Sequence, residues 1–186
     1  MVTGKRGKAD ADREVLRESL WPNSGDKVWK STNEVGFFQA PRSLPLFLRL
    51  LREKNICGKL DPSRVYEEFF SRHWGQGIVE VLDEDDHAYC AGYDGPRALR
   101  TWRERVNALA EVGFIRVFTK ANRKIGYVIL VDPRLAALEL RRQGKVSDIW
   151  WQTFQERQRK VKAPTDVDPM TEKKRPKVVR LSRSSA

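Results

Sequence analysis

Cysteine is scarce in this chain of 186 residues, which has only Cys57 and Cys90. Two cysteines cannot build the disulfide framework of a small secreted domain, so we expect both thiols to be reduced. Long hydrophobic runs are also missing: the longest has only a few residues, such as 128–131, whereas a transmembrane helix needs roughly 20. The basic residues 1–8 lead into residues 9–13 without the apolar stretch of a secretory signal. These absences predict an intracellular protein without a membrane span.

Sequence signatures of catalysis and of metal binding are missing as well. The segment 75–77 has two glycines but leads into a predicted strand, whereas phosphate-binding loops lead into a helix. Cys57, His73, His87 and Cys90 have the side-chain atoms that bind zinc, but only the last two have a suitable spacing. Neither histidine belongs to a known nucleophile motif. We therefore expect no enzyme activity, no cofactor and no metal.

Positive charge is abundant and unevenly distributed. The chain has 36 Lys and Arg against 25 Asp and Glu, which gives a formal net charge of +11. Residues 96–124 contain eight Lys and Arg against two Glu, and this excess equals the net charge of the whole segment 35–161. Such clustering is the electrostatic footprint of a surface that binds a polyanion. A solvated, charged helix face has the same composition, so charge alone leaves both interpretations open.

Changes in composition divide the chain into three parts. Residues 1–34 form an arm with one amphipathic stretch at 12–20, and we expect this arm to be flexible or partly helical. Residues 35–161 have the apolar periodicity of a folded domain. Residues 162–186 are basic, contain several prolines and lack periodicity, which predicts a disordered basic tail.

The folded segment alternates helical and strand patterns. Helical spacing predicts helices at 44–54, 61–74, 84–91, 96–112, 133–143 and 147–160. Strand patterns lie at 78–82, 114–119 and 125–131, and the last two must form a hairpin. Candidate helix caps precede four of the helices, namely Ser43, Asp61, Asp132 and Ser147. These elements predict an α+β fold that is mainly α, with a small three-stranded sheet and flanking N- and C-terminal helices.

The clearest helical pattern is that of residues 96–112. Apolar residues at spacings of three and four predict a buried face formed by Leu99, Trp102, Val106 and Leu109. Polar and basic side chains occupy the opposite face, namely Arg97, Arg100, Thr101, Glu104 and Asn107, with Arg103 at its margin. The hairpin that follows has a polar tip with Lys120, Asn122, Arg123 and Lys124.

The order of elements over residues 61–132 resembles that of the winged helix-turn-helix family. Residues 88–95 are similar to its helix and turn, and residues 103–115 to the end of its recognition helix as it enters the wing hairpin. The resemblance implies that helix 96–107 lies in the major groove of DNA and that the tip, residues 120–124, contacts an adjacent groove or phosphate. It covers about 40% of the chain and concerns the fold only.

The side chains on this predicted surface suit duplex DNA without appeal to the family. An arginine fork engages the two acceptors of a guanine edge, and Arg97, Arg100 or Arg103 could supply it, with Thr101 and Asn107 as further polar contacts to bases. Cations at a hairpin tip suit phosphate contacts, and the tip offers Lys120, Arg123 and Lys124 beside Asn122. The alternative is that the arginines are solvated or pair with Glu104 and Glu111 along the helix.

Two features allow other functions. The acidic run 83–86 would repel phosphates near the start of its helix, so either this end tilts away from DNA or the run meets a basic protein surface. Trp150 and Trp151 could cover the domain or a partner. The leading hypothesis is a sequence-specific, double-stranded DNA-binding protein of a bacterium, plasmid or phage, located in the cytoplasm with the nucleoid, or in the nucleus of a eukaryote. It would act as a transcriptional regulator or as a factor that binds a replication origin or a mobile element, with flanking helices that brace the domain or form a homodimer.

The alternatives are a protein-interaction module, which would bind a partner through the acidic run and the tryptophans, and an RNA- or single-strand-binding factor. We rank the second lower because the aromatic residues are predicted on helices or near residues 37–38 rather than across an open sheet face.

Overall fold

The computed structural model describes residues 3–24, 28, 38, 40–73 and 75–161, with side chains from residue 11 onward. The predicted basic tail 162–186 lies outside these described residues, as do Phe37 and Trp74. The chain divides into two compact units, residues 1–37 and 38–186, and each is described by itself. No helix of the described part is long and apolar enough to cross a membrane.

The first unit contains helix α1 (Thr3–Leu20). The predicted amphipathic stretch 12–20 is therefore helical, and the helix begins nine residues earlier than its apolar spacing indicates. After the helix ends, the Asn23 amide donates a hydrogen bond to the Glu18 carboxylate over 2.7 Å. This bond closes the chain back onto the last turn of α1.

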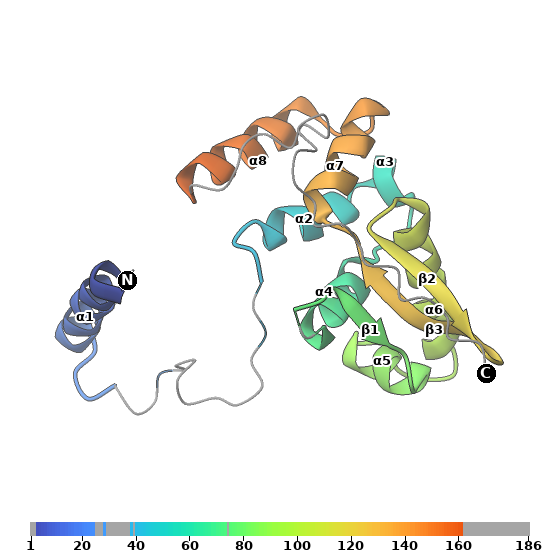
Figure 1. Ribbon diagram of the computed structural model, residues 1–186, viewed down its shortest axis with the longest axis horizontal. Helices are drawn as coiled ribbons and strands as arrows, with labels where there is room; N and C mark the ends of the chain where they lie inside the picture. Colours follow the sequence, from blue (N-terminus) through green and yellow to red (C-terminus); the bar gives the residue numbers. More distant parts are fainter. Residues whose placement is uncertain (1–2, 25–27, 29–37, 39, 74, 162–186) are drawn as a thin grey trace, which may run out of the picture. The chain divides into compact units, whose positions relative to one another are not determined.

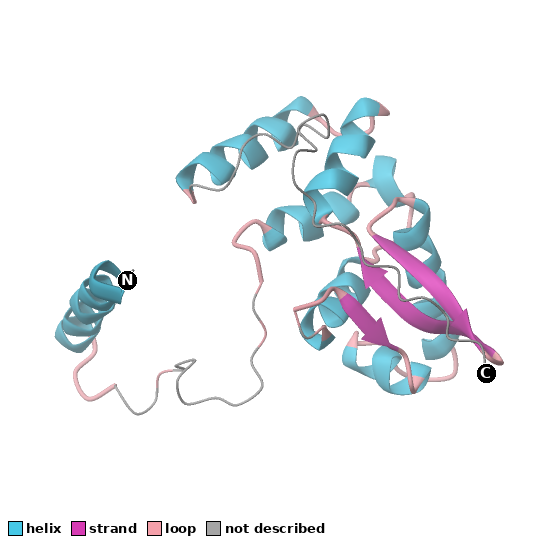
Figure 2. Cartoon of the chain, viewed as in Figure 1, coloured by secondary structure: helices cyan, strands magenta, loops and turns pink. Residues whose placement is uncertain are grey.

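The described part of the second unit is α+β and mainly helical, as the sequence predicts (Figures 1 and 2). Its elements follow in the order α2 (Leu44–Leu51), α3 (Lys54–Cys57), α4 (Ser63–Arg72), β1 (Ile78–Glu80), α5 (Glu84–Cys90), α6 (Ala98–Glu111), β2 (Ile115–Lys120), β3 (Arg123–Leu130), α7 (Pro133–Arg142) and α8 (Asp148–Lys160). Each predicted strand and helix is present, with shifts of a few residues at the ends.

One small antiparallel sheet has the strand order β1-β3-β2. Val128 of β3 lies between Val79 of β1 and Val117 of β2, and this row packs toward the core. Both strands of the predicted β2–β3 hairpin run closer to the tip than predicted, to Lys120 and Arg123. The tip is tight, since Ala121 has a φ of 50°.

The core joins the helices to the inner face of the sheet. Trp102, Val106 and Leu109 of α6 are fully buried and Leu99 packs partly buried against the core, which confirms the predicted apolar face. At the other end of the unit, α2 packs against α8, with ring centroids of Phe47 and Phe154 5.4 Å apart. Trp150 stacks on Phe154 at 5.3 Å. The flanking helices thus brace the domain, while homodimer formation stays a prediction.

Two of the four predicted helix caps are confirmed. The Asp132 carboxylate accepts from the Arg134 amide, and the Ser147 hydroxyl accepts from the Trp150 amide. Asp61 lies one residue before the cap position of α4, which is Pro62, although its carboxylate accepts from the Ser63 amide. Ser43 is at the cap position of α2, but its side chain caps no amide. Its backbone is helical (φ −89°, ψ −5°) rather than extended, so its hydroxyl is not presented to the first turn.

The predicted helix 44–54 ends three residues early, at Leu51, and the short helix α3 after it was not predicted. The chain leaves the helix at Arg52, becomes extended at Glu53 and re-enters a short turn, α3. In a continuous helix Ile56 would point roughly 140° away from Leu51. The break returns Ile56 to the core, where both residues are buried.

Candidate nucleic-acid interface

Helices α5 and α6 are joined by a tight turn that depends on glycine. Gly92 and Gly95 have φ values of 82° and 75°, which residues other than glycine rarely adopt. Gly92 also lies against α4, where an added Cβ would come within 3.1 Å of the Arg64 guanidinium. The Tyr93 amide donates to the Ala88 carbonyl over 2.9 Å and closes the end of α5. This turn fixes the direction in which α6 leaves α5.

The outward face of α6 carries the predicted polar residues. Arg97, Arg100, Arg103 and Asn107 are exposed, whereas Thr101 is half-buried. Arg100 donates to Glu104 over 3.0 Å, so the predicted pairing along the helix occurs here. In the described part of the chain, the side chains of Arg97 and Asn107 have no ion pair or hydrogen bond. These two side chains are therefore available to a ligand without the loss of an intramolecular contact.

The cations of the hairpin point in two directions. Lys120 donates to Glu80 and to the Tyr127 hydroxyl, each over 2.6 Å, and so lies over the outer face of the sheet. This hydrogen bond lowers the pKa of Glu80 and raises that of Lys120. Arg123 turns to the other side and donates to the Val81 carbonyl over 3.2 Å. Among the described residues the Lys124 side chain has no partner, while its backbone carbonyl accepts from the Thr119 hydroxyl over 3.3 Å.

A groove of about 770 Å³ lies between α6, the hairpin and the start of α5. Five of the predicted site residues line it, namely Arg103, Asn107, Asn122, Arg123 and Lys124. Its floor is apolar and includes Val117 and Ile125. The other predicted residues, Arg97, Arg100, Thr101 and Lys120, do not line it. The groove has one rim of helix and one rim of hairpin, and both carry positive charge.

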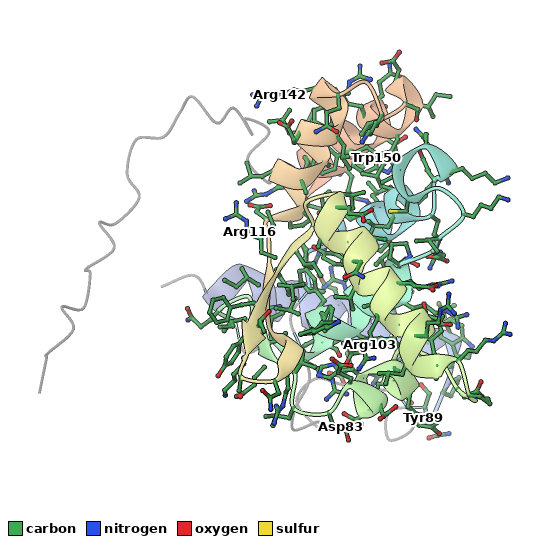
Figure 3. The ribbon with its side chains drawn as sticks, turned by 90° about the vertical axis from the view of Figure 1, so that its right-hand side faces the viewer. Asp83, Tyr89, Arg103, Arg116, Arg142 and Trp150 are labelled. Atoms are coloured by element: carbon green, nitrogen blue, oxygen red, sulfur yellow. The ribbon has the colours of Figure 1, made fainter. Side chains whose placement is uncertain are left out.

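Two residues of the acidic run also line this groove. Asp83 caps α5, and its carboxylate accepts from the amides of Asp85 and Asp86. Glu84 accepts a hydrogen bond from Arg103 over 2.6 Å. Figure 3 shows Asp83 and Arg103 at the same end of the unit, opposite Arg142 and Trp150.

The third carboxylate of the run with a partner in the structure is Asp86, which pairs with Arg72 of α4 at 2.7 Å. The hydrogen bond and the charge of Arg72 lower the pKa of Asp86. The run is thus used largely within the molecule. Two of its acids pair with cations from α4 and α6 of the same chain, while the expected tilt away from DNA and the expected contact with a basic partner stay predictions.

Behind the acidic run lies a buried polar pair that sequence reasoning missed. His87 of α5 and Glu68 of α4 are 2.9 Å apart, and both are more than nine-tenths buried. The His87 ring lies 5.6 Å from Phe69 and 5.8 Å from Trp102. Arg72 also contacts Glu68. The pair joins α4 to α5, and no group of three potential metal ligands occurs among the residues described.

The structure favours one of the two alternatives for Trp150 and Trp151, and it differs from the sequence interpretation for Phe118. Trp150 is 3% exposed and donates its indole proton to the Leu46 carbonyl, so it cannot contact a partner. Trp151 is partly buried against the same cluster. Phe118, in contrast, lies on the outer face of the sheet opposite Tyr127 and is 69% exposed. An aromatic residue is therefore present on an open sheet face, contrary to the expectation.

Comparison with known protein families, with curated proteins and with solved structures finds no match to this chain. The interpretation of the groove therefore depends on its own residues and on the fold around it.

Proposed function

We propose that residues 61–132 form a winged helix-turn-helix domain and that the protein binds double-stranded DNA in a sequence-specific manner. It would act as a transcriptional regulator or as a factor that binds a replication origin or a mobile element. In this proposal α6 enters the major groove, and the tip of the β2–β3 hairpin contacts the phosphate backbone.

The order α4-β1-α5-α6-β2-β3 supports the proposed domain, because a helix, a tight turn and a second helix are followed directly by a hairpin. The exposed face of α6 is long enough to present several side chains to base edges, since the helix has 14 residues. Its opposite face is fixed in the core by Trp102, which is fully buried. A helix held in this way presents its polar face as a rigid surface.

The groove between α6 and the hairpin is the observation that carries the proposal. It brings Arg103 of the helix to one place with Arg123 and Lys124 of the hairpin tip, although they are separated in sequence. The acids nearby are largely balanced, because Glu84 pairs with Arg103 and Asp86 pairs with Arg72. Arg97, Arg123 and Lys124 have no carboxylate partner among the described residues and retain their charge for phosphates.

The salt dependence of DNA binding tests this assignment. The full chain is first used to select bound fragments from a random duplex library, and the selected duplex is then titrated by fluorescence anisotropy. Three phosphate contacts predict a slope of log affinity against log salt of about −2.7, or a loss of about fortyfold between 50 and 200 mM. Duplex binding that does not change with salt, or no duplex binding at low salt, would refute the proposal.

Variants separate the hairpin rim of the groove from the start of α6, which lies outside the groove. Lys124→Ala should weaken every duplex alike and reduce the slope by about 0.9. Arg97→Ala should also reduce discrimination between the selected and a scrambled duplex if it contacts a base. Arg142→Ala, which removes the same charge at the opposite end of the unit (Figure 3), is the matched control and should leave both properties unchanged.

A second candidate function, single-strand binding, is favoured by the exposed Phe118. Bases stack on aromatic side chains, and Arg116 lies on the same exposed face of β2. Phe118→Ser should reduce binding to single-stranded DNA in that case and leave duplex binding unchanged. If the variant has the same affinity for a single strand as the original chain, the sheet face is not the binding surface.

A further inference from the structure

A second pocket, with a volume of about 390 Å³, lies at the other end of the unit from the groove. It is formed where α2 and α7 begin and where α8 ends. Pro41, Phe47 and Pro133 contribute apolar walls. Its volume is within the roughly 300–1,000 Å³ of pockets that hold small molecules.

Gln158 is the unusual residue of this pocket. The buried face of α8 consists of Trp150, Phe154 and Gln158, at intervals of four residues. The third position of this apolar stripe is thus occupied by an amide, which is only 3% exposed. Within the described part of the chain its side chain has no hydrogen-bond partner. The Gln158 amide is not among the fully buried side-chain groups of the described residues that lack a partner, so it opens into the pocket, where a ligand can pair with it.

Ser43 adds a second buried polar group to the same pocket. It is 6% exposed and stands at the N-terminal end of α2, but its hydroxyl caps no amide of that helix. Its side chain also has no hydrogen bond within the residues described. The Ser43 hydroxyl and the Gln158 amide can both donate to an acceptor in the pocket.

The charges around the pocket favour an anion. Asp132 is the only carboxylate among the described residues that line it, and Arg134 neutralises this group through hydrogen bonds of 2.6 to 3.2 Å. Arg42 is exposed and has no ion pair among the described residues. The last turn of α8 has three more cations, Arg157, Arg159 and Lys160, which do not line the pocket. The positive ends of the α2 and α7 dipoles favour an anion at this position, whereas the negative end of the α8 dipole opposes it.

We propose that this pocket binds a small organic carboxylate with an apolar body. The carboxylate accepts hydrogen bonds from Gln158 and Ser43 and faces Arg42, and the apolar body packs on Phe47 and the two prolines. This inference does not depend on DNA binding, since the pocket shares no residue with the groove.

The test uses cyclohexanecarboxylate as the probe and its neutral amide, cyclohexanecarboxamide, as the matched ligand. The full chain is labelled with ¹⁵N and titrated in NMR spectra that resolve the side-chain amide groups. The signal of Gln158 is identified by its loss in Gln158→Leu. We expect saturable shifts of this signal with the carboxylate, and binding of the carboxamide about tenfold weaker or more, because hydrogen bonds to charged groups are the stronger ones.

Two variants and a control complete the test. Gln158→Leu should bind the carboxylate at least about tenfold more weakly. Because this variant lacks the Gln158 signal, its affinity is measured from the other NMR signals that shift. Arg42→Gln changes an exposed position that should not affect folding, and it should also weaken binding of the carboxylate. Gln155→Leu, an exposed change on the same helix, should bind as the original chain does. Three results would overturn the proposal. The first is that no saturable shift occurs up to a carboxylate concentration of about 20 mM, which exceeds the dissociation constant expected for so small a ligand. The others are equal binding of the carboxamide and unchanged binding in Gln158→Leu.

Discussion

Gly126 of β3 is the position where the hairpin is least tolerant of a side chain. Strand β2 is irregular between Phe118 and Lys120, and this irregularity brings the Lys120 backbone directly over Gly126. A Cβ added at Gly126 would collide with the Lys120 Cβ and would lie 2.7 Å from its backbone nitrogen and 3.0 Å from its Cα. Because backbone atoms cannot move aside as a flexible side chain does, Gly126→Ala must displace one strand from the other.

The expected cost follows from this geometry. Overpacking of a well-packed site costs typically 1–3 kcal/mol, and a clash with main-chain atoms belongs in the upper half of that range, at about 2 kcal/mol or more. Since 1 kcal/mol shifts the unfolding midpoint of a domain of 150–250 residues by roughly 2–4 °C, we expect a decrease of about 4–8 °C. The φ of Gly126 is not positive, so its backbone conformation is open to other residues. The expected effect of alanine is therefore steric rather than conformational.

Thermal and urea unfolding followed by circular dichroism measure the change. Lys124→Ala, at an exposed position of the same hairpin, is the control and should stay within about 0.5 kcal/mol of the original chain. Adding Lys120→Gly to Gly126→Ala removes the Cβ contact but leaves the backbone contacts, so it should restore only part of the stability. If the free energy of unfolding of Gly126→Ala is within about 0.5 kcal/mol of that of the original chain, the two strands do not approach as closely as described.

Three further predictions concern charge and reactivity. Glu84→Gln removes a carboxylate from the groove and releases its arginine, so duplex affinity should rise and the salt slope should steepen by about 0.9; Glu156→Gln, an exposed change on α8, should do neither, and equal effects of the two would argue against the groove. Burial raises the pKa of the Cys57 thiol to about 11, whereas Cys90 is exposed, so iodoacetamide at neutral pH should modify Cys90 first, as measured by peptide mass spectrometry. Because the pKa of Asp86 is lowered by its arginine partner, its ionised form stabilises the folded chain above the ordinary value of 3.8, and this contribution is lost as the pH falls through the lowered pKa. The unfolding temperature should therefore fall more steeply below pH 3.8 in the original chain than in Asp86→Asn, and identical pH profiles would show that the ion pair does not contribute.

The parts of the fold that sequence predicts well are those with local causes. Asp132 followed by proline, and Ser147 before an apolar stripe, specify helix starts through contacts of two or three residues. The buried face of α6 follows from spacing alone, because apolar residues three and four positions apart share one helix face, whichever element packs against it. The hairpin tip was predicted to be wider than it is, because polar residues at 119–124 resemble a turn, although pairing continues to Lys120 and Arg123.

The parts that sequence did not predict depend on partners far away in the chain. Arg103 and Glu84 are 19 residues apart, as are His87 and Glu68, and no local pattern connects them. The groove could be anticipated only as two separate basic segments, since its depth depends on the angle between α6 and the hairpin. The burial of Trp150 likewise depends on α2, which precedes it by about 100 residues. For the candidate site, therefore, the residue types were predictable and their ion pairs were not.

Strand β2 is also an outer strand of its sheet, since β3 occupies the centre. A strand in this position leaves one row of backbone groups unpaired, and such rows attract strands of other molecules. Arg116, Phe118 and Lys120 alternate along its exposed side, so the apolar ring is enclosed by two cations. Like charges would be brought together if two such strands met, which opposes edge-to-edge association. The cations of β2 thereby disfavour the joining of two such sheets along this edge.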